Sequence, residues 1–288
     1  MLALCVSAAP RCQGAAARPA MNLPESGTAF ERIAATYDAN STNAPLSRWL
    51  RAQLWERLAA LFPPDSYLLE LGCGTGEDAV WLAQRGTRVL ATDVSPQMLA
   101  RTAQKAAQHG VAHLIETRPL DFARTESWRL PDAAFDGVYS NYGALNCTEH
   151  WSALGAVLAR TVRQGGYAAF SVIGRFSLWE TLWHMAHADF RIAARRWRGK
   201  STAQIGGVTF PIYYPTARQF RKAFGAAWRL RALHGWGVFL PPSDVYGALE
   251  RRPRLSRLLC ALERRFARLP LCAYLADHFW IALRRTGG

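Results

Sequence analysis

A glycine-rich segment in the first third of the chain has the composition of a ligand-binding loop. The apolar run Leu68–Leu71 leads into Gly72, Gly74 and Gly76, and helical periodicity begins at Glu77. Glycine lets a backbone turn sharply and approach a ligand closely, and the first N–H groups of a helix have no partner within that helix. The segment therefore predicts a strand, a loop and a helix that together bind a nucleotide-like ligand.

Alternating apolar and amphipathic segments around this loop predict the sheet that positions it. Between residues 67 and 174, short apolar runs alternate with helical stretches, as is typical of a parallel, doubly wound sheet. We expect strands at residues 67–71, 88–92, 113–116, 135–140 and 167–173, and helices at 77–85, 95–110 and 151–162. Ser95 and Pro96 fit the start of the second of these helices, as N-cap and first helical residue. The predicted fold class is α/β, with a Rossmann-like sheet.

The segments on either side of this sheet predict a lid and a cap. Helices expected at residues 29–37 and 46–61 can close over the ligand cleft. We therefore interpret residues 21–174 as one ligand-binding domain and residues 175–288 as a substrate-binding part, with an inserted helical and strand cap and the last strands of the same sheet. Residues 1–20 are expected to be a disordered, dispensable extension. The elements expected after residue 174 are helices at 176–200, 216–224 and 252–269, a strand or hairpin at 206–214, and strands at 228–238 and 278–283.

The spacing of the glycines limits the class of ligand that the loop can bind. It is G-x-G-x-G rather than the dinucleotide fingerprint G-x-G-x-x-G, which disfavours NAD and FAD. With Glu70 two residues ahead of the first glycine, the segment resembles the first motif of class I S-adenosylmethionine (SAM)-dependent methyltransferases. The resemblance covers about residues 29–174 and is weaker in the final strands. It implies a seven-stranded sheet of the methyltransferase type, SAM as the cofactor, and a glycine loop that wraps the methionine part of SAM.

Two acidic residues follow strands of the predicted sheet. Asp93 ends the second strand, where a carboxylate can accept hydrogen bonds from both ribose hydroxyls. The alternative is a turn aspartate that precedes a helix. After the third strand, the resemblance implies that Asp121 bonds the adenine amino group while Phe122 packs on the ring. Their alternatives are a loop aspartate and a core phenylalanine.

Polar residues at the carboxyl edge of the fourth strand complete the predicted site. Asn141 and Tyr142 are expected to face SAM or the substrate, because ligands of open α/β sheets bind at that edge. Base-modifying methyltransferases carry N-P-P-Y-like residues here, and this chain lacks the prolines, which disfavours a nucleic-acid substrate. Residues 30–38 resemble the N-terminal segment of ubiquinone/menaquinone-type methyltransferases, which implies that Tyr37 reaches the SAM carboxylate; alternatively, it belongs to an apolar helix face. The predicted cofactor-binding residues are Tyr37, Glu70, Gly72, Cys73, Gly74, Thr75, Gly76, Asp93, Val94, Met98, Asp121, Phe122, Asn141 and Tyr142.

The chemistry of methyl transfer makes a dedicated base optional. An in-line displacement needs mainly alignment and exclusion of water, although a hydroxyl or acid acceptor must lose its proton. Glu180, His184 and His187 have the spacing of one helical face. They form a base relay, a Glu/His metal site or an ordinary helix surface, and a metal would need ligands from more than this helix. We predict no metal, with His184 and Tyr142 as the candidate catalytic residues.

The C-terminal part differs from the rest in charge and aromatic content. The net charge is +14, and the whole excess lies in residues 171–288. This indicates an anionic substrate, an anionic membrane surface or nucleic acid, or else only the arginine-rich composition of a GC-rich genome. Dense aromatic residues predict a pocket for an aromatic or lipid-like acceptor, or a cap core. The amphipathic helix expected at 252–269 can rest on an anionic membrane or be solvated.

Composition and cysteine spacing suggest where the chain acts. No run reaches the roughly 20 apolar residues needed to span a bilayer, and no basic region precedes the first apolar stretch. The six cysteines contain no C-x-x-C pair, which favours a reduced, cytoplasmic protein. The predicted function is SAM-dependent methylation of a small molecule. The alternatives are a nucleic-acid methyltransferase that uses the basic C-terminal part, and a SAM-binding protein without transferase activity.

Overall fold

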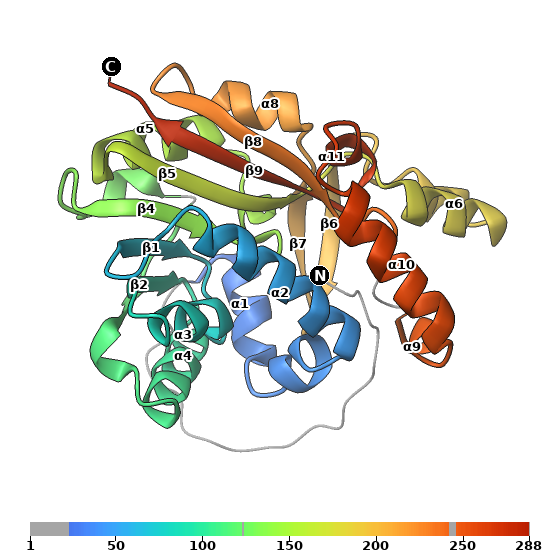
Figure 1. Cartoon of the computed structure of the whole chain (residues 1–288), viewed down its shortest axis with the longest axis horizontal. Helices are drawn as coiled ribbons and strands as arrows, with labels where there is room; N and C mark the ends of the chain where they lie inside the picture. The colour runs from blue at the N-terminus through green and yellow to red at the C-terminus, as the bar shows by residue number, and fades with distance from the viewer. Residues whose placement is uncertain (1–22, 123, 242–245, 288) are drawn as a thin grey trace.

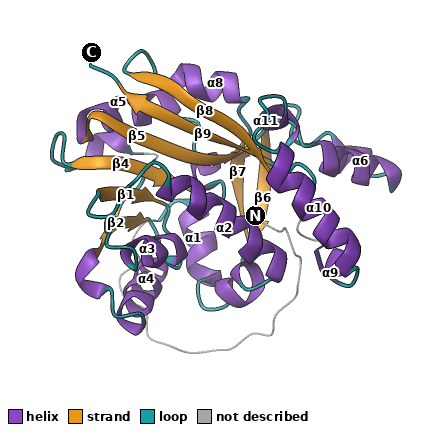
Figure 2. Cartoon of the chain, viewed as in Figure 1, coloured by secondary structure: helices purple, strands orange, loops and turns teal. Residues whose placement is uncertain are grey.

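The computed structural model describes residues 23–122, 124–241 and 246–287 (Figure 1). The prediction for residues 1–20 lies outside this range. The core of the fold is a single seven-stranded sheet with helices on both faces (Figure 2). Within the described residues, no helix is long and apolar enough to cross a membrane.

The sheet has the strand order β3-β2-β1-β4-β5-β9-β8. The first five strands in this order are parallel to one another, and β9 runs antiparallel to both of its neighbours. This arrangement confirms the predicted Rossmann-like α/β fold, and it places the last two strands in the same sheet as the glycine motif. The strands are β1 (Tyr67–Leu71), β2 (Arg88–Asp93), β3 (Ile115–Pro119), β4 (Phe135–Ser140), β5 (Val162–Ile173), β8 (Trp228–Trp236) and β9 (His278–Arg285).

Helices cover both faces because the central strands are apolar on both sides. On one face α5 and α8 bury aromatic and leucine side chains such as Leu154 and Phe220, and on the other α2 packs Leu50 and Leu54 toward Trp236. The predicted N-cap of α4 is confirmed, since the Ser95 hydroxyl accepts a hydrogen bond from the Met98 N–H. These helices are α2 (Pro45–Ala59), α3 (Glu77–Ala83), α4 (Pro96–Gln108), α5 (Trp151–Thr161), α8 (Ala217–Ala223), α9 (Tyr246–Glu250), α10 (Pro253–Phe266) and α11 (Cys272–Leu275).

The first helix begins earlier than predicted. α1 spans Glu25–Ile33, and the π-helix η1 (Asp38–Thr42) follows it. Ala29 and Phe30 pack against the hairpin formed by β6 (Lys200–Ile205) and β7 (Val208–Tyr213). The N-terminal lid therefore rests on the cap, which the sequence pattern did not reveal.

Two predictions of local structure were wrong. The single helix expected at 176–200 divides into α6 (Leu178–Ala186) and α7 (Phe190–Ala193). Ala188 adopts a left-handed conformation with φ of 58°, and the Asp189 side chain then caps α7 by accepting the Ile192 N–H. The strand expected at 167–173 begins earlier, at Val162, and its pairing with β4 shifts register near this start.

Candidate active site

A cavity lies at the carboxyl ends of β1, β2 and β4. The N-terminal lid forms its other wall through Phe30 on α1, Tyr37 before η1 and Arg51 on α2. This is the predicted location for a ligand of an open α/β sheet. The predicted residues that line it are Tyr37, Glu70, Gly72, Cys73, Gly74, Thr75, Asp93, Val94, Met98, Phe122, Asn141 and Tyr142.

The glycines of the loop serve different purposes. A Cβ atom added to Gly74, whose φ is +55°, would meet no protein atom within 4 Å, so this position faces open space. Gly76 precedes α3 with φ of +80°, and a Cβ there would lie 2.6 Å from Thr102 Cγ2. Gly74 therefore leaves room for a ligand, whereas Gly76, which does not line the cavity, lets α3 pack against α4.

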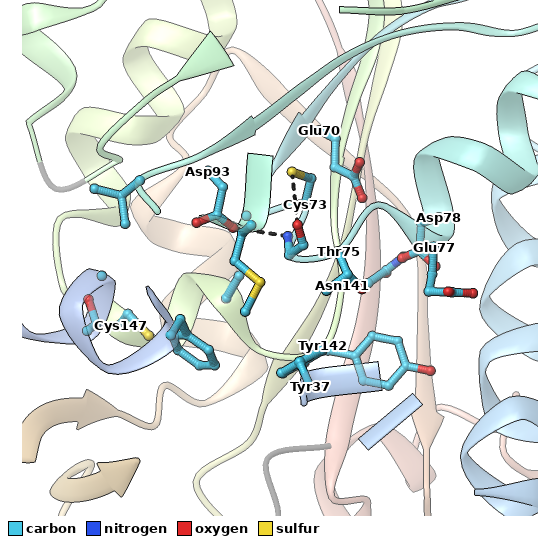
Figure 3. Close-up of a pocket in the computed structure, with 18 of the residues that line it drawn as sticks. Tyr37, Glu70, Cys73, Thr75, Glu77, Asp78, Asp93, Asn141, Tyr142 and Cys147 are labelled. Carbon is cyan, nitrogen blue, oxygen red and sulfur yellow. Dashed lines mark hydrogen bonds between the residues drawn. The ribbon is translucent and has the colours of Figure 1, made fainter. Parts of the chain in front are cut away.

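Asp93 lies at one side of the glycine loop (Figure 3). Its carboxylate accepts the Gly74 N–H at 3.0 Å and the Ser95 N–H at 2.9 Å, which fixes its orientation. Desolvation by burial raises the pKa of Asp93 to about 6, despite these hydrogen bonds. Each oxygen keeps acceptor capacity for a further donor, as recognition of a ribose diol requires.

A buried ion pair lies at the other side of the loop. Arg51 Nη1 donates to Asp78 Oδ1 at 2.7 Å, and Asp78 also accepts from Trp55 Nε1 and Asn141 Nδ2, both at 2.8 Å. The Arg51 guanidinium lies 3.9 Å from the centre of the Tyr142 ring. The sequence analysis missed this group, because Arg51 comes from the lid and only folding brings it to α3. The one available signal was Asp78, the second of two acids that follow the glycine motif.

Several buried polar atoms near this pair have no hydrogen-bond partner among the described residues. They include Glu70 Oε2, Asn141 Oδ1 and the Tyr142 hydroxyl. Desolvation, with the Asp78 charge as a further cause, raises the pKa of Glu70 well above its usual value. An ammonium group beside Glu70 would stabilise its ionised form, and a carboxylate would pair with Arg51. The cavity thus matches a zwitterionic amino-acid group at one end and a ribose at the other.

Further hydrogen bonds hold the lid onto the sheet. Asp38 accepts from the Thr75 hydroxyl at 2.6 Å and from Lys105 Nζ at 2.8 Å. Burial opposes its ionisation, but these hydrogen bonds outweigh burial and lower the pKa of Asp38. Glu31 accepts the Gln97 N–H at 2.9 Å, in the first turn of α4. These hydrogen bonds therefore hold the lid against the glycine loop and against the loop that follows Asp93.

Tyr142 has a backbone conformation that is rare for a tyrosine. Its φ is +56°, and its ring packs edge-on to Trp236 at 5.2 Å. Its hydroxyl has no partner among the described residues. Such strain persists where the surroundings fix the residue, and it is common at ligand sites.

Some predicted site residues lie apart from the cavity. Asp121 does not line it; its carboxylate lies 3.7 Å from Arg124 Nε, in a neighbouring groove. His184 lies on α6, also outside the cavity lining. Glu180, expected on the same face as His184, is buried and bonded to Arg195 and Arg196. The predicted Glu180–His184–His187 face is therefore divided between the interior and the surface.

Comparison with known proteins identifies the family. Residues 68–166 match the family described as "Methyltransferase domain". A malonyl-[acyl-carrier protein] O-methyltransferase from Pseudescherichia vulneris is 34% identical over 261 residues, which cover 89% of this chain and 95% of that protein. The chain belongs to the class I SAM-dependent methyltransferases. The Serratia marcescens enzyme of the same name is 29% identical over 90% of this methyltransferase and 96% of its own length.

A solved structure supports the fold assignment. The SAM-dependent methyltransferase from Mesorhizobium loti superimposes with a TM-score of 0.53 at 21% identity, covering 80% of this chain and 97% of that one. The methyltransferase therefore uses SAM as its methyl donor and acts on a small-molecule acceptor. Asp93 at one end of the cavity fits the ribose of SAM, and Glu70 with Arg51 at the other end fits its amino-acid group.

Proposed function

We propose that this methyltransferase transfers the methyl group of SAM to a carboxylate oxygen of a small acyl thioester, as the names of the Serratia and Pseudescherichia relatives suggest. The observation that carries this proposal is the composition of the cavity wall. Among the described residues, its lining includes neither histidine nor lysine, and of its carboxylates Glu77, Asp78 and Asp93 already pair with other groups. A carboxylate is already ionised at neutral pH and needs no base, whereas a hydroxyl acceptor would need one.

We assign the cofactor contacts from the positions of the lining residues. Asp93 would bind the ribose hydroxyls, and Phe122 would pack against adenine. Asp121 directly precedes Phe122 and remains the proposed partner of the adenine amino group. At the other end, Glu70 would accept from the methionine ammonium and Arg51 would bind the methionine carboxylate. The remaining predicted contacts are Tyr37, Gly72, Cys73, Gly74, Thr75, Gly76, Val94, Met98, Asn141 and Tyr142.

In the proposed reaction the protein mainly orients the reactants. SAM supplies an activated methyl group when it is bound. Arg51, held by Asp78 and by the Tyr142 ring, fixes one end of the donor while the lid keeps water out. The acceptor oxygen forms its bond to the methyl carbon as the methyl–sulfur bond breaks, which leaves a methyl ester and an uncharged thioether. A base such as His184 has no proton to remove from a carboxylate.

We also propose an anionic acceptor, a cytoplasmic location and a peripheral contact with a membrane. An anionic acceptor is consistent with the positive charge of residues 171–288. The cysteines that the structure describes are all free, which suits a reducing cytoplasm. The apolar residues exposed on α10 support a peripheral contact with a membrane and an acceptor of lipid-like character.

Methyl transfer to matched thioesters tests the acceptor. The purified enzyme is incubated with methyl-labelled SAM and either malonyl or acetyl groups carried on acyl carrier protein. We expect a base-labile methyl ester on the malonyl thioester only, and none with Asp93→Ala. If SAM binds but the malonyl thioester takes up no label, the carboxylate assignment is wrong and the enzyme class is unaffected.

A further inference from the structure

Exposed apolar side chains gather in two segments of the C-terminal part. Soluble proteins rarely expose contiguous apolar patches, and those that exist mark contact sites. Among the described residues, all the large apolar side chains that are well exposed to solvent lie in residues 178–199 or 253–275. In the first segment these are Leu182, Met185, Phe190 and Trp197. In the second they are Leu255, Leu258, Phe266, Leu269, Leu271 and Tyr274.

The helix α10 is attached to the body by very little packing. Of its 14 residues only Glu263 is buried. The Glu263 carboxylate accepts the N–H groups of Gly237, Val238 and Phe239 at 2.8, 2.9 and 2.9 Å, which fixes the helix to the end of the sheet. Leu259 and Cys260 pack partly against the core, but the protein leaves Leu255 40% and Leu258 56% exposed on the same helix.

An internal ion network joins the two segments. Arg196, directly after α7, donates to Asp277 Oδ1 at 2.7 Å and to Glu180 on α6. Asp277 lies two residues beyond α11. In Figure 1, α6, α10 and α11 accordingly lie on the same side of the molecule. The two apolar segments are thus joined through this network, and we call their combined surface the arm face.

The arm face is strongly cationic. Each acidic residue that the structure describes there accepts hydrogen bonds within the fold; these residues are Glu180, Asp189, Glu250, Glu263 and Asp277. The exposed arginines are not balanced in this way, so the face attracts anions and repels a second copy of itself. These arginines are Arg191, Arg198, Arg251, Arg252, Arg254, Arg257, Arg264, Arg265 and Arg268.

A groove on this face combines apolar and basic groups. It lies between α2 and α10, and Leu46, Trp49 and Cys260 contribute apolar surface. Arg257 and Arg264 line the same groove, with the Arg264 guanidinium 5.8 Å from the Trp49 ring. An acyl chain below an anionic headgroup fits this pattern, because arginine can extend its charge to the headgroups above apolar surface.

We propose that the arm face docks on an anionic lipid bilayer. Exposed leucines with an aromatic side chain in each segment and surrounding arginines match the composition of interfacial helices. The inference rests on the peripheral contact proposed above and extends it from α10 to a composite face that includes α6 and α7. The helix α2 lines the groove with Trp49 and the reaction cavity with Arg51, so one helix connects the lipid surface and the active site.

Vesicle co-sedimentation of the full chain tests this proposal. The probes are vesicles of phosphatidylcholine alone and of phosphatidylcholine mixed with phosphatidylglycerol. We expect binding to the anionic vesicles only, and a loss of roughly tenfold or more with Arg254→Glu, because each basic residue near the surface contributes about 1 kcal/mol. Leu258→Glu and Trp197→Glu should also weaken binding. Arg160→Glu makes the same charge change at an exposed position of α5 and should have no effect.

Several outcomes would overturn the proposal. They are equal binding to neutral vesicles, no binding to either kind, an unchanged Trp197→Glu variant, or a vesicle-free dimer that Leu258→Glu dissociates. Salt-sensitive binding of an acidic carrier protein to the arm face, without vesicle binding, would assign the face to a protein partner instead. Unchanged SAM affinity and thermal stability verify that the variants fold. Methyl transfer to a soluble thioester is measured without vesicles, so failure of docking and failure of the acceptor assignment are distinguishable.

Discussion

The cofactor half and the C-terminal half each contain a buried cluster of charges, and only the first cluster borders the cavity. In the first, Arg51 pairs with Asp78 at the wall of a cavity. In the second, Arg196 bonds both Glu180 and Asp277 between packed segments. Burying the charges of either cluster costs desolvation free energy, which offsets much of the attraction between them. Neither cluster is therefore a strong source of stability by itself.

The difference lies in whether the neighbouring polar atoms line the cavity. Beside the Arg51 pair, Glu70 Oε2 and Asn141 Oδ1 have no partner among the described residues. In the Arg196 cluster, both oxygens of Glu180 accept hydrogen bonds. Buried polar atoms are nearly always satisfied in folded proteins, so unsatisfied atoms that also line a cavity mark a place where a ligand can bind. The Arg196 cluster also has an unsatisfied neighbour among the described residues, Nε2 of His278, but it does not line the cavity, so we interpret it as a structural connection.

The largest expected effect on cofactor affinity is at Asp93. Asp93→Ala removes the acceptors proposed for both ribose hydroxyls, and a hydrogen bond to a charged group contributes about 1.5–3 kcal/mol. We expect the Kd for SAM to rise at least a hundredfold, measured by isothermal titration. Unchanged affinity would disprove the ribose assignment.

A smaller loss is expected at Arg51. Arg51→Ala removes one proposed contact to the methionine carboxylate, so the Kd for SAM should rise roughly tenfold to a hundredfold. Stability should also fall, because Asp78 loses its buried partner. The matched control is Arg48→Ala, an exposed position one turn earlier on α2. Equal effects of the two substitutions would contradict a ligand role for Arg51.

Acidification should weaken SAM binding through Asp93. Its pKa of about 6 means that the carboxylate becomes protonated and stops accepting two hydrogen bonds as pH falls through 6. Between pH 7 and pH 5 we expect the Kd for SAM to rise about tenfold. Because the folded-state pKa lies above the unfolded value, the folded state binds more protons in this range, and protonation of Asp93 favours folding as pH falls. Asp93→Asn, which does not titrate, should bind weakly with a much flatter pH profile.

A substitution in the Arg196 cluster should lower the stability of the fold and leave SAM binding almost unchanged. Arg196→Ala leaves Glu180 and Asp277 buried without their shared cation, so the free energy of unfolding should fall by about 3–5 kcal/mol. The Kd for SAM should stay within about twofold, because distant sites are nearly independent. Denaturant unfolding and SAM titration of the same samples measure both quantities. The exposed Arg198→Ala is the control, and a large loss of SAM affinity in Arg196→Ala alone would show that the two clusters are coupled.

The smallest effect is expected from removal of residues 1–20. The sequence predicts that this segment is dispensable, so thermal stability and SAM affinity should not change. A lower melting temperature of the shortened chain would contradict that prediction.

The sequence by itself determined the local features of the methyltransferase. The bounds of β1 and β4 and the N-cap at Ser95 followed from hydrophobic periodicity, glycine spacing and capping chemistry, all of which act over a few neighbouring residues. For the same reason the glycine motif, with Asp93 at the end of the next strand, predicted a nucleotide-like ligand, and the resemblance of this motif to class I methyltransferases specified SAM.

Only the tertiary structure decided which distant side chains meet. Arg51 and Asp78 are 27 residues apart, and Gln97 donates to Glu31 across 66 residues. Helical spacing put Glu180 and His184 on one face, but the packing of α6 buried the first among arginines and left the second outside the cavity. A periodic pattern shows which side of an element is apolar. It does not show which other element covers that side, because this depends on the free energy of packing the whole chain.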